Sequence, residues 1–333
     1  MKVNAQAALA AKQSLKPFSY QPDALGPHDV EVTITHCGIC HSDVHLIDND
    51  WGVSAYPLVP GHEIIGTVSA LGREVEHLKT GQRVGVGWQR GSCLVCEQCL
   101  RGDENLCAEN RATCVGHHGG FADKVYVDSR FAFAIPDALA SENAAPLLCG
   151  GATTYSPLRR HVRPDMRVGV IGIGGLGHMA LQFAAAFGCE VTALSSTPEK
   201  EKEAKSFGAH RFINTADSSA MKKAGGSIDF IISTAFANLD WGSYLDLLRP
   251  NGKLCFVGVP PAPISFHVGA LLGGQKTVCA SVIGSRWLIR EMLEFSARHG
   301  IKAQTEVVPM ADVNKAIEKV RANKARYRMV LKN

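Results

Sequence analysis

The sequence lacks a long apolar run, a strong excess of charge and a basic cluster. Its 35 basic and 31 acidic side chains give a formal net charge of +4, so we predict neither a nucleic-acid partner nor a membrane partner. The apolar stretches are short and interrupted by glycine, proline or charge, and none is expected to span a bilayer. With 333 residues, 46% of them hydrophobic, the chain is long enough for two domains with separate cores.

An apolar core ahead of a cleavage site is also missing from the N-terminal stretch MKVNAQAALAAKQSLKPF. We therefore interpret this stretch as part of the mature protein and expect a cytoplasmic location. Structural disulfides are rare in a reducing compartment, where clustered cysteines more often bind a metal ion.

Four of the eleven cysteines lie in the fifteen-residue stretch CLVCEQCLRGDENLC. They are Cys93, Cys96, Cys99 and Cys107. Two C-x-x-C steps share one cysteine, and flanking glycines indicate a loop at about 90–110 that can direct several sulfurs to one point. A redox-active C-x-x-C and chance clustering are the alternatives. We predict a closed four-thiolate zinc site, which has no open position and performs no chemistry.

A second group of potential ligands and proton carriers follows two apolar, β-branched runs, in HCGICHSDVH (36–45) and PGHEIIG (60–66). The group comprises Cys40, Ser42, Asp43, His45, His62 and Glu63. A single histidine near a strand end is most often a structural residue. Together with the distant Cys149, however, Cys40 and His62 form a Cys/His/Cys set. Three protein ligands and one open position are typical of catalytic zinc.

The glycine-rich stretch RVGVIGIGGLGHMALQFAAAFG (167–188) predicts a strand, a tight turn and a helix. The turn Gly172-x-Gly174-x-x-Gly177 would let the backbone approach a pyrophosphate at the helix N-terminus. The elements expected around it are strand 168–171, helix 179–187, strand 190–196, helix 199–207, strands 210–213 and 228–234, helix 240–248 and strand 252–259. This alternation predicts a doubly wound parallel sheet.

An acidic residue is missing where the second strand of an NAD-binding fold usually supplies Asp or Glu to the ribose. Ser195, Ser196 and Thr197 stand there instead, followed by Lys200. Small hydroxyls and a cation suit a 2′-phosphate, so we predict NADP(H). The alternative, that Thr197-Pro198 caps the next helix, is compatible with this prediction.

The motifs GHEIIGTVSALGREV (61–75), LLCGGATTYSPL (147–158) and GIGGLG (172–177), with the cysteine lobe, resemble the zinc-dependent medium-chain alcohol dehydrogenases. CGICHSDVH, YPLVPGHE, SVIGS and RYRMVL resemble the cinnamyl-alcohol-dehydrogenase branch and its bacterial aldehyde reductases most closely. The resemblance implies an α/β chain with a GroES-like catalytic domain at 1–150 and 284–333. A Rossmann cofactor-binding domain at 151–283 would interrupt it.

The resemblance also implies two zinc ions per chain and roles for individual residues. Cys40, His62 and Cys149 would bind the catalytic zinc, with Cys40 rather than Cys37 because the family pattern is Gly-Ile-Cys. Glu63 would lie behind the metal as a transient ligand, and Asp43 would orient His62. Ser42 would contact the substrate oxygen, and His45 would be the distal end of a proton relay. The residues expected to contact the cofactor are Thr153, Gly172, Gly174, Gly175, Leu176, Gly177, Ser195, Ser196, Thr197, Lys200, Thr234, Gly258, Ser281 and Ile283. Of these, Thr153, Thr234, Gly258 and the segment 281–283 would contact the nicotinamide half.

The expected activity is zinc- and NADP(H)-dependent interconversion of aldehydes and primary alcohols, with broad-range aldehyde reduction. Asp50 matches a position that contacts substrate in the family, and Trp51 and Trp88 would narrow the pocket and make it apolar, unless they serve core packing. One alternative is an NAD-dependent zinc polyol or secondary-alcohol dehydrogenase. Another is a non-enzymatic zinc- and NADPH-binding or redox-sensing protein. A homodimer is also expected, with the strand LCFVGV at a sheet edge that could pair across it.

Overall fold

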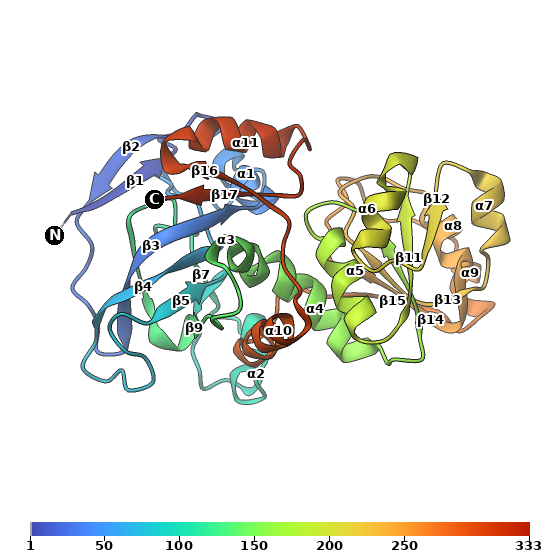
Figure 1. Ribbon diagram of the computed structural model, residues 1–333, viewed down its shortest axis with the longest axis horizontal. Helices are drawn as coiled ribbons and strands as arrows, with labels where there is room; N and C mark the ends of the chain where they lie inside the picture. The colour runs from blue at the N-terminus through green and yellow to red at the C-terminus, as the bar shows by residue number, and fades with distance from the viewer. Residues whose placement is uncertain (1) are drawn as a thin grey trace. The chain divides into compact units, whose positions relative to one another are not determined.

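The computed structural model describes residues 2–333, which form two compact units (Figure 1). One unit contains the residues up to Ala152 and those from Gly284 onward, and the other contains Thr153–Ile283. The domain boundaries expected from the sequence, at 150/151 and 283/284, lie at or close to these junctions. Among residues 2–333, no helix is long and apolar enough to cross a membrane.

The first unit is built on a seven-stranded sheet in which β3 (Asp29–Ile39) pairs with β4, β8 and β17. The other strands of this sheet are β4 (Ile64–Leu71), β5 (Arg83–Val86), β8 (Lys124–Asp128), β9 (Ala132–Ala134), β16 (Thr305–Pro309) and β17 (Arg328–Lys332). Two small sheets pair β1 (Val3–Ala7) with β2 (Lys16–Tyr20) and β6 (Gln89–Gly91) with β7 (Arg111–Ala112). The helices are α1 (His41–Asp48), α2 (Glu97–Leu100), α3 (Ser141–Ala144), α10 (Arg286–His299) and α11 (Val313–Arg321), with short 3-10 turns η1 (Glu104–Leu106), η2 (Ser129–Phe131), η3 (Ala145–Leu148) and η5 (Met310–Asp312).

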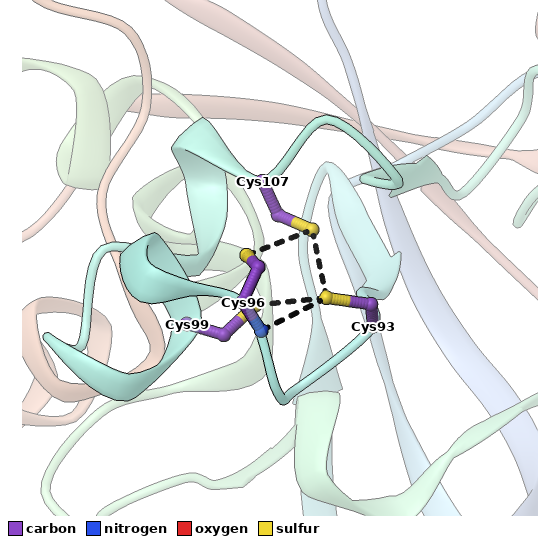
Figure 2. Close-up of side chains that lie close together, drawn as sticks. All are labelled: Cys93, Cys96, Cys99 and Cys107. Atoms are coloured by element: carbon purple, nitrogen blue, oxygen red, sulfur yellow. Dashed lines mark hydrogen bonds between the residues drawn. The ribbon is translucent and has the colours of Figure 1, made fainter.

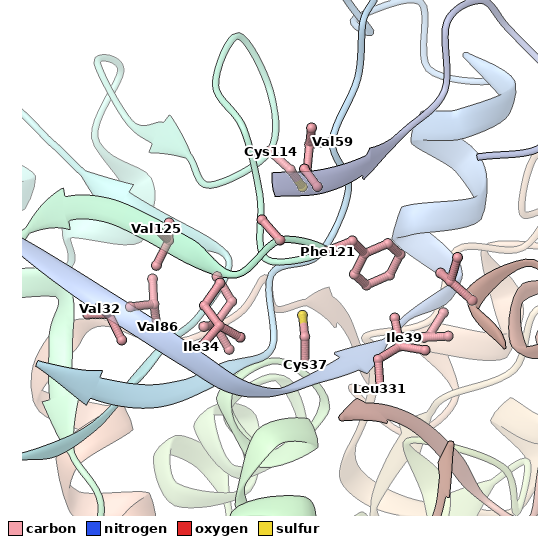
Figure 3. Close-up of a cluster of buried hydrophobic side chains, with 14 of the residues drawn as sticks. Val32, Ile34, Cys37, Ile39, Val59, Val86, Cys114, Phe121, Val125 and Leu331 are labelled. Carbon is pink, nitrogen blue, oxygen red and sulfur yellow. The ribbon is translucent and has the colours of Figure 1, made fainter. Parts of the chain in front are cut away.

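The core of this unit explains the alternating pattern of β3. Val30, Val32 and Ile34 are buried on one face of the strand. Cys37, farther along, is fully buried and lies opposite Leu331 of the antiparallel β17, which the C-terminal segment adds beside β3 (Figures 1 and 3). This pairing joins the last strand of the chain to the strand that leads directly into Cys40. The fold thus places the C-terminal strand beside the strand that ends directly before Cys40.

A glycine permits the sharp approach to His62. Gly61 has a φ of +102°, and a Cβ placed on it would lie 2.6 Å from the ring of Phe121. Any other residue would therefore be strained and crowded at this position. The turn places His62 and Glu63 directly before β4.

The second unit contains a six-stranded parallel sheet in the order β12-β11-β10-β13-β14-β15. Its strands are β10 (Arg167–Ile171), β11 (Glu190–Ser195), β12 (Arg211–Asn214), β13 (Ile228–Ser233), β14 (Leu248–Phe256) and β15 (Thr277–Ala280). The helices are α5 (Gly177–Ala186), α6 (Glu201–Ser206), α7 (Ser218–Lys223), α8 (Trp241–Asp246) and α9 (Gly269–Leu272), with the turn η4 (Pro198–Lys200); α4 (Gly150–His161) runs into this unit from the first. β10 lies between β11 and β13, so the strand order reverses beside the glycine-rich turn. Such switch points are where open α/β sheets bind ligands.

The expectation that LCFVGV lies at a sheet edge is wrong. Leu254, Cys255 and Phe256 of this stretch end β14, which lies between β13 and β15, and they are buried as in an interior strand. The edge strand on this side is β15, whose four residues TVCA are too short to give a clear pattern in the sequence. Helix α7 is also absent from the elements expected from the sequence.

Candidate active site and metal centres

Cys40, His62 and Cys149 converge although they are far apart in the sequence. Cys40 precedes α1 at the end of β3, His62 precedes β4, and Cys149 lies between η3 and α4. The ligand atoms of these three residues and of Glu63 all lie within 4.8 Å of one another, and all four residues are buried. The expected catalytic ligands therefore form one compact group.

The geometry of this group fits a zinc ion. Two thiolates bound at about 2.3 Å to one tetrahedral zinc would lie about 3.8 Å apart, and the sulfurs of Cys40 and Cys149 are 3.9 Å apart. His62 Nε2 is buried and has no hydrogen-bond partner among the described residues. A buried, unpaired nitrogen is costly unless it binds a ligand. The three residues thus offer two thiolates and an imidazole nitrogen.

Asp43 forms hydrogen bonds with both the Cys40 segment and the Gly61–His62 segment. Its Oδ1 accepts hydrogen bonds from the Gly61 N–H at 2.9 Å and from His62 Nδ1 at 3.1 Å. Its Oδ2 accepts one from the Cys40 N–H at 2.8 Å. Because His62 Nδ1 donates to Asp43, the lone pair of the ring lies on Nε2, toward the thiols.

Two buried residues beside the site were not identified from the sequence. Arg328 of β17 forms an ion pair with Glu63, and burial raises the pKa of Glu63 to about 7 although Arg328 opposes the shift. Cys114 is fully buried, with its sulfur 3.9 Å from His62 Nδ1. An arginine in the charged tail RYRMVL looks like a surface residue. Only the need of a buried glutamate for a cation could have indicated Arg328.

The expected proton-relay residues lie on α1, next to the ligands. Ser42 Oγ is 3.7 Å from the sulfur of Cys40. His45 follows almost one turn later, and its Nδ1 lies 2.7 Å from Asp50 Oδ2. Asp50, expected in the substrate pocket, thus directly contacts His45. A ring nitrogen held by a carboxylate leaves the opposite nitrogen, Nε2, to exchange protons.

Trp88 and Trp51 form an aromatic wall between the two histidines. The Trp88 ring centre is 4.9 Å from that of His62, at an interplanar angle of 87°. Trp51 lies 6.2 Å from Trp88 and 5.2 Å from His45. Trp51 is 42% exposed, so core packing does not account for it.

The four lobe cysteines form a separate cluster (Figure 2). The Sγ–Sγ distances are 3.5 Å for Cys107–Cys93, 3.8 Å for Cys96–Cys107 and 3.9 Å for Cys93–Cys99, close to the edge of a tetrahedral zinc–thiolate site. All four are free thiols. Hydrogen bonds from the N–H groups of Val95 and Cys96 lower the pKa of Cys93 to about 7, which favours the thiolate that a metal binds.

The glycine-rich turn has the close backbone packing expected of a pyrophosphate site. Gly172 has a φ of +83°, and a Cβ on Gly177 would lie 1.8 Å from the Gly172 carbonyl oxygen. A Cβ on Gly174 would meet nothing within 4 Å, so space for a ligand remains there. Gly175 and Leu176 complete the turn before α5. Thr234 Oγ1 donates to the Ile171 and Gly172 carbonyls, so it also stabilises the turn.

Two of the four polar residues that are expected to contact the cofactor at and after the end of β11 form hydrogen bonds with backbone groups. Ser195 Oγ accepts a hydrogen bond from the Thr197 N–H at 3.2 Å, and Lys200 Nζ donates to the Ile173 carbonyl at 2.7 Å. Ser196 and Thr197 are exposed, and Thr197 precedes η4 without a side-chain capping bond. Their hydroxyls therefore remain available to a ligand.

The other expected cofactor residues lie at element ends. Ser281 donates its N–H to the Phe256 carbonyl at the end of β14, and Ile283 has a φ of +44°. A Cβ on Gly258 would lie 2.5 Å from the Ala235 carbonyl oxygen, so the two loops approach closely there. Thr153 lies on α4.

Comparisons with known proteins agree with these features. The profile of the alcohol dehydrogenase GroES-like domain matches residues 26–137, and that of the zinc-binding dehydrogenases matches 175–298. An aldehyde reductase (AdhA) of Synechocystis sp. is 45% identical over 330 residues, which cover 99% of this chain and 98% of that protein. A mannitol dehydrogenase of Petroselinum crispum is 43% identical over 327 residues, covering 95% of this chain and 97% of that protein.

Solved structures show the same similarity. A cinnamyl alcohol dehydrogenase from Sorghum bicolor superposes with a TM-score of 0.96 at 40% identity, covering 100% of this chain and 98% of that one. A cinnamyl alcohol dehydrogenase (CAD) from Helicobacter pylori, solved with NADP(H), gives 0.92 at 34% identity with the same coverage.

The chain therefore belongs to the zinc-dependent medium-chain alcohol dehydrogenases, a family of oxidoreductases that act on CH–OH groups. Within the family it falls in the branch of the cinnamyl alcohol dehydrogenases and bacterial aldehyde reductases. The expected fold, a GroES-like domain with a Rossmann-type parallel sheet, is confirmed. The expectation of an enzyme is confirmed with it.

Proposed function

We propose that this enzyme interconverts aldehydes and primary alcohols with NADP(H), and that it acts mainly as a broad-range aldehyde reductase. The convergence of Cys40, Cys149 and the unpaired His62 Nε2 carries this proposal. The similarity of the chain to an aldehyde reductase and to cinnamyl alcohol dehydrogenases supports the proposal. We also propose one zinc ion at this site and one in the cysteine lobe.

When bound, zinc would supply Lewis-acid polarisation of the carbonyl, and NADPH would supply the hydride. The chain's own residues then manage the proton. Ser42, whose Oγ lies near the Cys40 sulfur, would donate its hydroxyl proton to the substrate oxygen, and His45 would replenish that proton. Asp50 orients the His45 ring through its contact with Nδ1.

The preference for NADP(H) rests on the residues after β11. No carboxylate stands at Ser195, Ser196 or Thr197 to repel a 2′-phosphate, and the exposed hydroxyls of Ser196 and Thr197 can donate hydrogen bonds to it. Lys200 lies one short turn further on. The NADP(H) complex of the Helicobacter pylori relative supports the same choice.

The aromatic wall favours apolar substrates. Trp88 and Trp51 present two indole faces between His62 and His45, where an aldehyde chain would leave the metal site. Flat or aliphatic groups gain from contact with such surfaces, whereas polyol hydroxyls would lose hydrogen bonds to water. Oxidation of a sugar alcohol remains the second candidate, because one relative is a mannitol dehydrogenase.

The test is the rate of NADPH and of NADH oxidation by the zinc-loaded enzyme with cinnamaldehyde, benzaldehyde and butanal. Mannitol with NADP⁺ or NAD⁺ serves as the competing reaction. We expect rapid NADPH oxidation with the aldehydes and slow NADH oxidation. Faster mannitol oxidation, or a preference for NADH, would contradict the proposed substrate class or cofactor.

We propose a homodimer as well, because the family resemblance implies one. Pairing across a dimer would use the edge strand β15 rather than the interior strand β14. Sedimentation of the purified protein tests this directly.

A further inference from the structure

Glu104 joins the four-cysteine lobe to the start of helix α10. It opens η1, three residues before Cys107. Its Oε1 accepts hydrogen bonds from Arg286 Nε at 2.8 Å and Nη2 at 2.6 Å, and its Oε2 accepts one from the Arg286 backbone N–H at 3.4 Å. One carboxylate therefore holds both the side chain and the main chain of the first residue of α10.

The carboxylate of this ion pair lies in the interior, and its arginine partner is partly buried. The Glu104 side chain is 4% exposed and that of Arg286 is 29% exposed. The main-chain carbonyl of Glu104 accepts from the buried Gln89 Nε2 at 2.8 Å, and the Arg286 guanidinium lies 5.3 Å from the centre of the Phe131 ring. The carboxylate also faces the positive end of the 14-residue helix α10. Breaking such a pair leaves a buried charge without a partner, unlike the loss of a surface salt bridge.

The segment 281–283, which is among the parts of the chain expected to contact the nicotinamide, lies shortly before Arg286. Ile283 has a φ of +44°, which a β-branched residue holds only where its surroundings fix the backbone. Ser285 is 2% exposed and caps α10 by accepting a hydrogen bond from the Leu288 N–H. Anchoring the chain at Ser285 and Arg286 therefore limits the freedom of the segment 281–284 that precedes them.

We propose that Glu104 is a positioning residue for the nicotinamide-binding segment 281–283 and that it acts through Arg286. The lobe then contributes to cofactor binding, although its cysteines take no part in the chemistry. This inference rests on the proposed use of a nicotinamide cofactor. Loss of the carboxylate should weaken cofactor binding more than it slows the reaction of the bound complex.

The test compares Glu104→Gln with Glu97→Gln in zinc-loaded protein. Glu104→Gln keeps the side-chain shape and removes the charge. Glu97 is a matched control, because its 2.9 Å pair with Arg101 lies on the same lobe but both side chains are about two-thirds exposed, at 67% and 68%. The readouts are amide hydrogen exchange over residues 281–289 without cofactor, the NADPH dissociation constant and the zinc content.

For Glu104→Gln we expect exchange and the NADPH dissociation constant each to rise at least about fivefold, the lower end of typical coupling between sites. The zinc content and kcat should change little. Glu97→Gln should match the wild type in every readout. NADPH binding unchanged in Glu104→Gln would overturn the positioning role, whether or not exchange is faster.

If Glu104→Gln loses the lobe zinc or fails to fold, Arg286→Gln tests the positioning role instead, because Arg286 lies outside the lobe. It should weaken NADPH binding by the same factor with zinc retained, and unchanged binding would refute the inference. Where all variants fold, the double variant Glu104→Gln/Arg286→Gln should bind NADPH as tightly as each single variant, because each change breaks the same ion pair. A loss of affinity in the double variant equal to the sum of the two single losses would contradict the inference. A wild-type protein that binds neither nicotinamide cofactor would instead refute the proposed function.

Discussion

The two cysteine clusters have similar sulfur spacings but different surroundings. In the lobe, the four thiols face one another on short turns, and Cys93 and Cys96 are half-buried. Beside β3 and β4, two thiols share a buried group with an imidazole and a carboxylate, and Asp43 hydrogen-bonds both ligand segments. A set of four thiolates saturates a zinc ion, whereas two thiolates and one imidazole leave a position for a substrate. We therefore propose that the surroundings, more than the cysteines themselves, distinguish the structural site from the reactive one.

Removing one ligand of the buried group is the strongest test of the proposed difference between the two clusters. Cys149→Ser should lower turnover at least about 10³-fold, because the metal's charge stabilisation of several kcal/mol is lost. The zinc content should fall by one equivalent while the lobe cysteines stay protected. Near-normal turnover in this variant would show that the buried group is not the reactive centre.

The reciprocal change is Cys99→Ser in the lobe. It should remove the other zinc equivalent and lower the free energy of unfolding by several kcal/mol, because metal binding contributes directly to folding of such loops. Calorimetry and metal analysis measure both effects, and molecules that remain folded should keep the chemical step. A fully stable variant with two zinc ions would refute the structural role of the lobe.

Ser42→Ala tests the proton path without altering a ligand. Turnover should fall about 10²-fold, the usual contribution of a positioned proton donor. Zinc content and the NADPH dissociation constant should not change, because Ser42 contacts only the Cys40 sulfur in the ligand group. Equal kcat values for variant and wild type would remove this serine from the relay.

Asp43→Asn should have a smaller effect, on metal affinity. The amide keeps the size of the side chain but weakens the hold on His62 Nδ1 and on the Cys40 N–H, so zinc affinity at the buried site should fall about 10- to 100-fold. Competition with a chelator measures this, and Asp50→Asn is the control. Asp50 contacts His45 and should leave zinc affinity unchanged.

The two clusters also differ in how well the sequence predicts them. The lobe cysteines lie within one loop, so their spacing alone predicts a common metal. Cys40 and Cys149 are 109 positions apart, so their spacing predicts nothing; the residue types suggested a Cys/His/Cys set, and the resemblance to known enzymes implied that the set binds the catalytic zinc. Arg328 and Cys114 had no local signal, because their roles depend on tertiary contacts with Glu63 and His62.

Burial patterns explain the other successes and the error. Val168 to Ile171, followed by the glycine turn, indicates a buried parallel strand, because both faces of the strand are covered. The same reasoning could not rank LCFVGV within its sheet. An edge position depends on whether a later strand pairs with it, and β15 is too short to be recognised from its sequence.

The central claim is that the buried cysteine group, and not the lobe, holds the metal that turnover requires. Its most direct test is stepwise zinc removal by a chelator, with the aldehyde-dependent rate of NADPH oxidation and cysteine alkylation followed by mass spectrometry. We predict that the rate falls in step with alkylation of Cys40 and Cys149 while Cys93 to Cys107 remain protected. A rate that persists after Cys40 and Cys149 are alkylated would contradict the account.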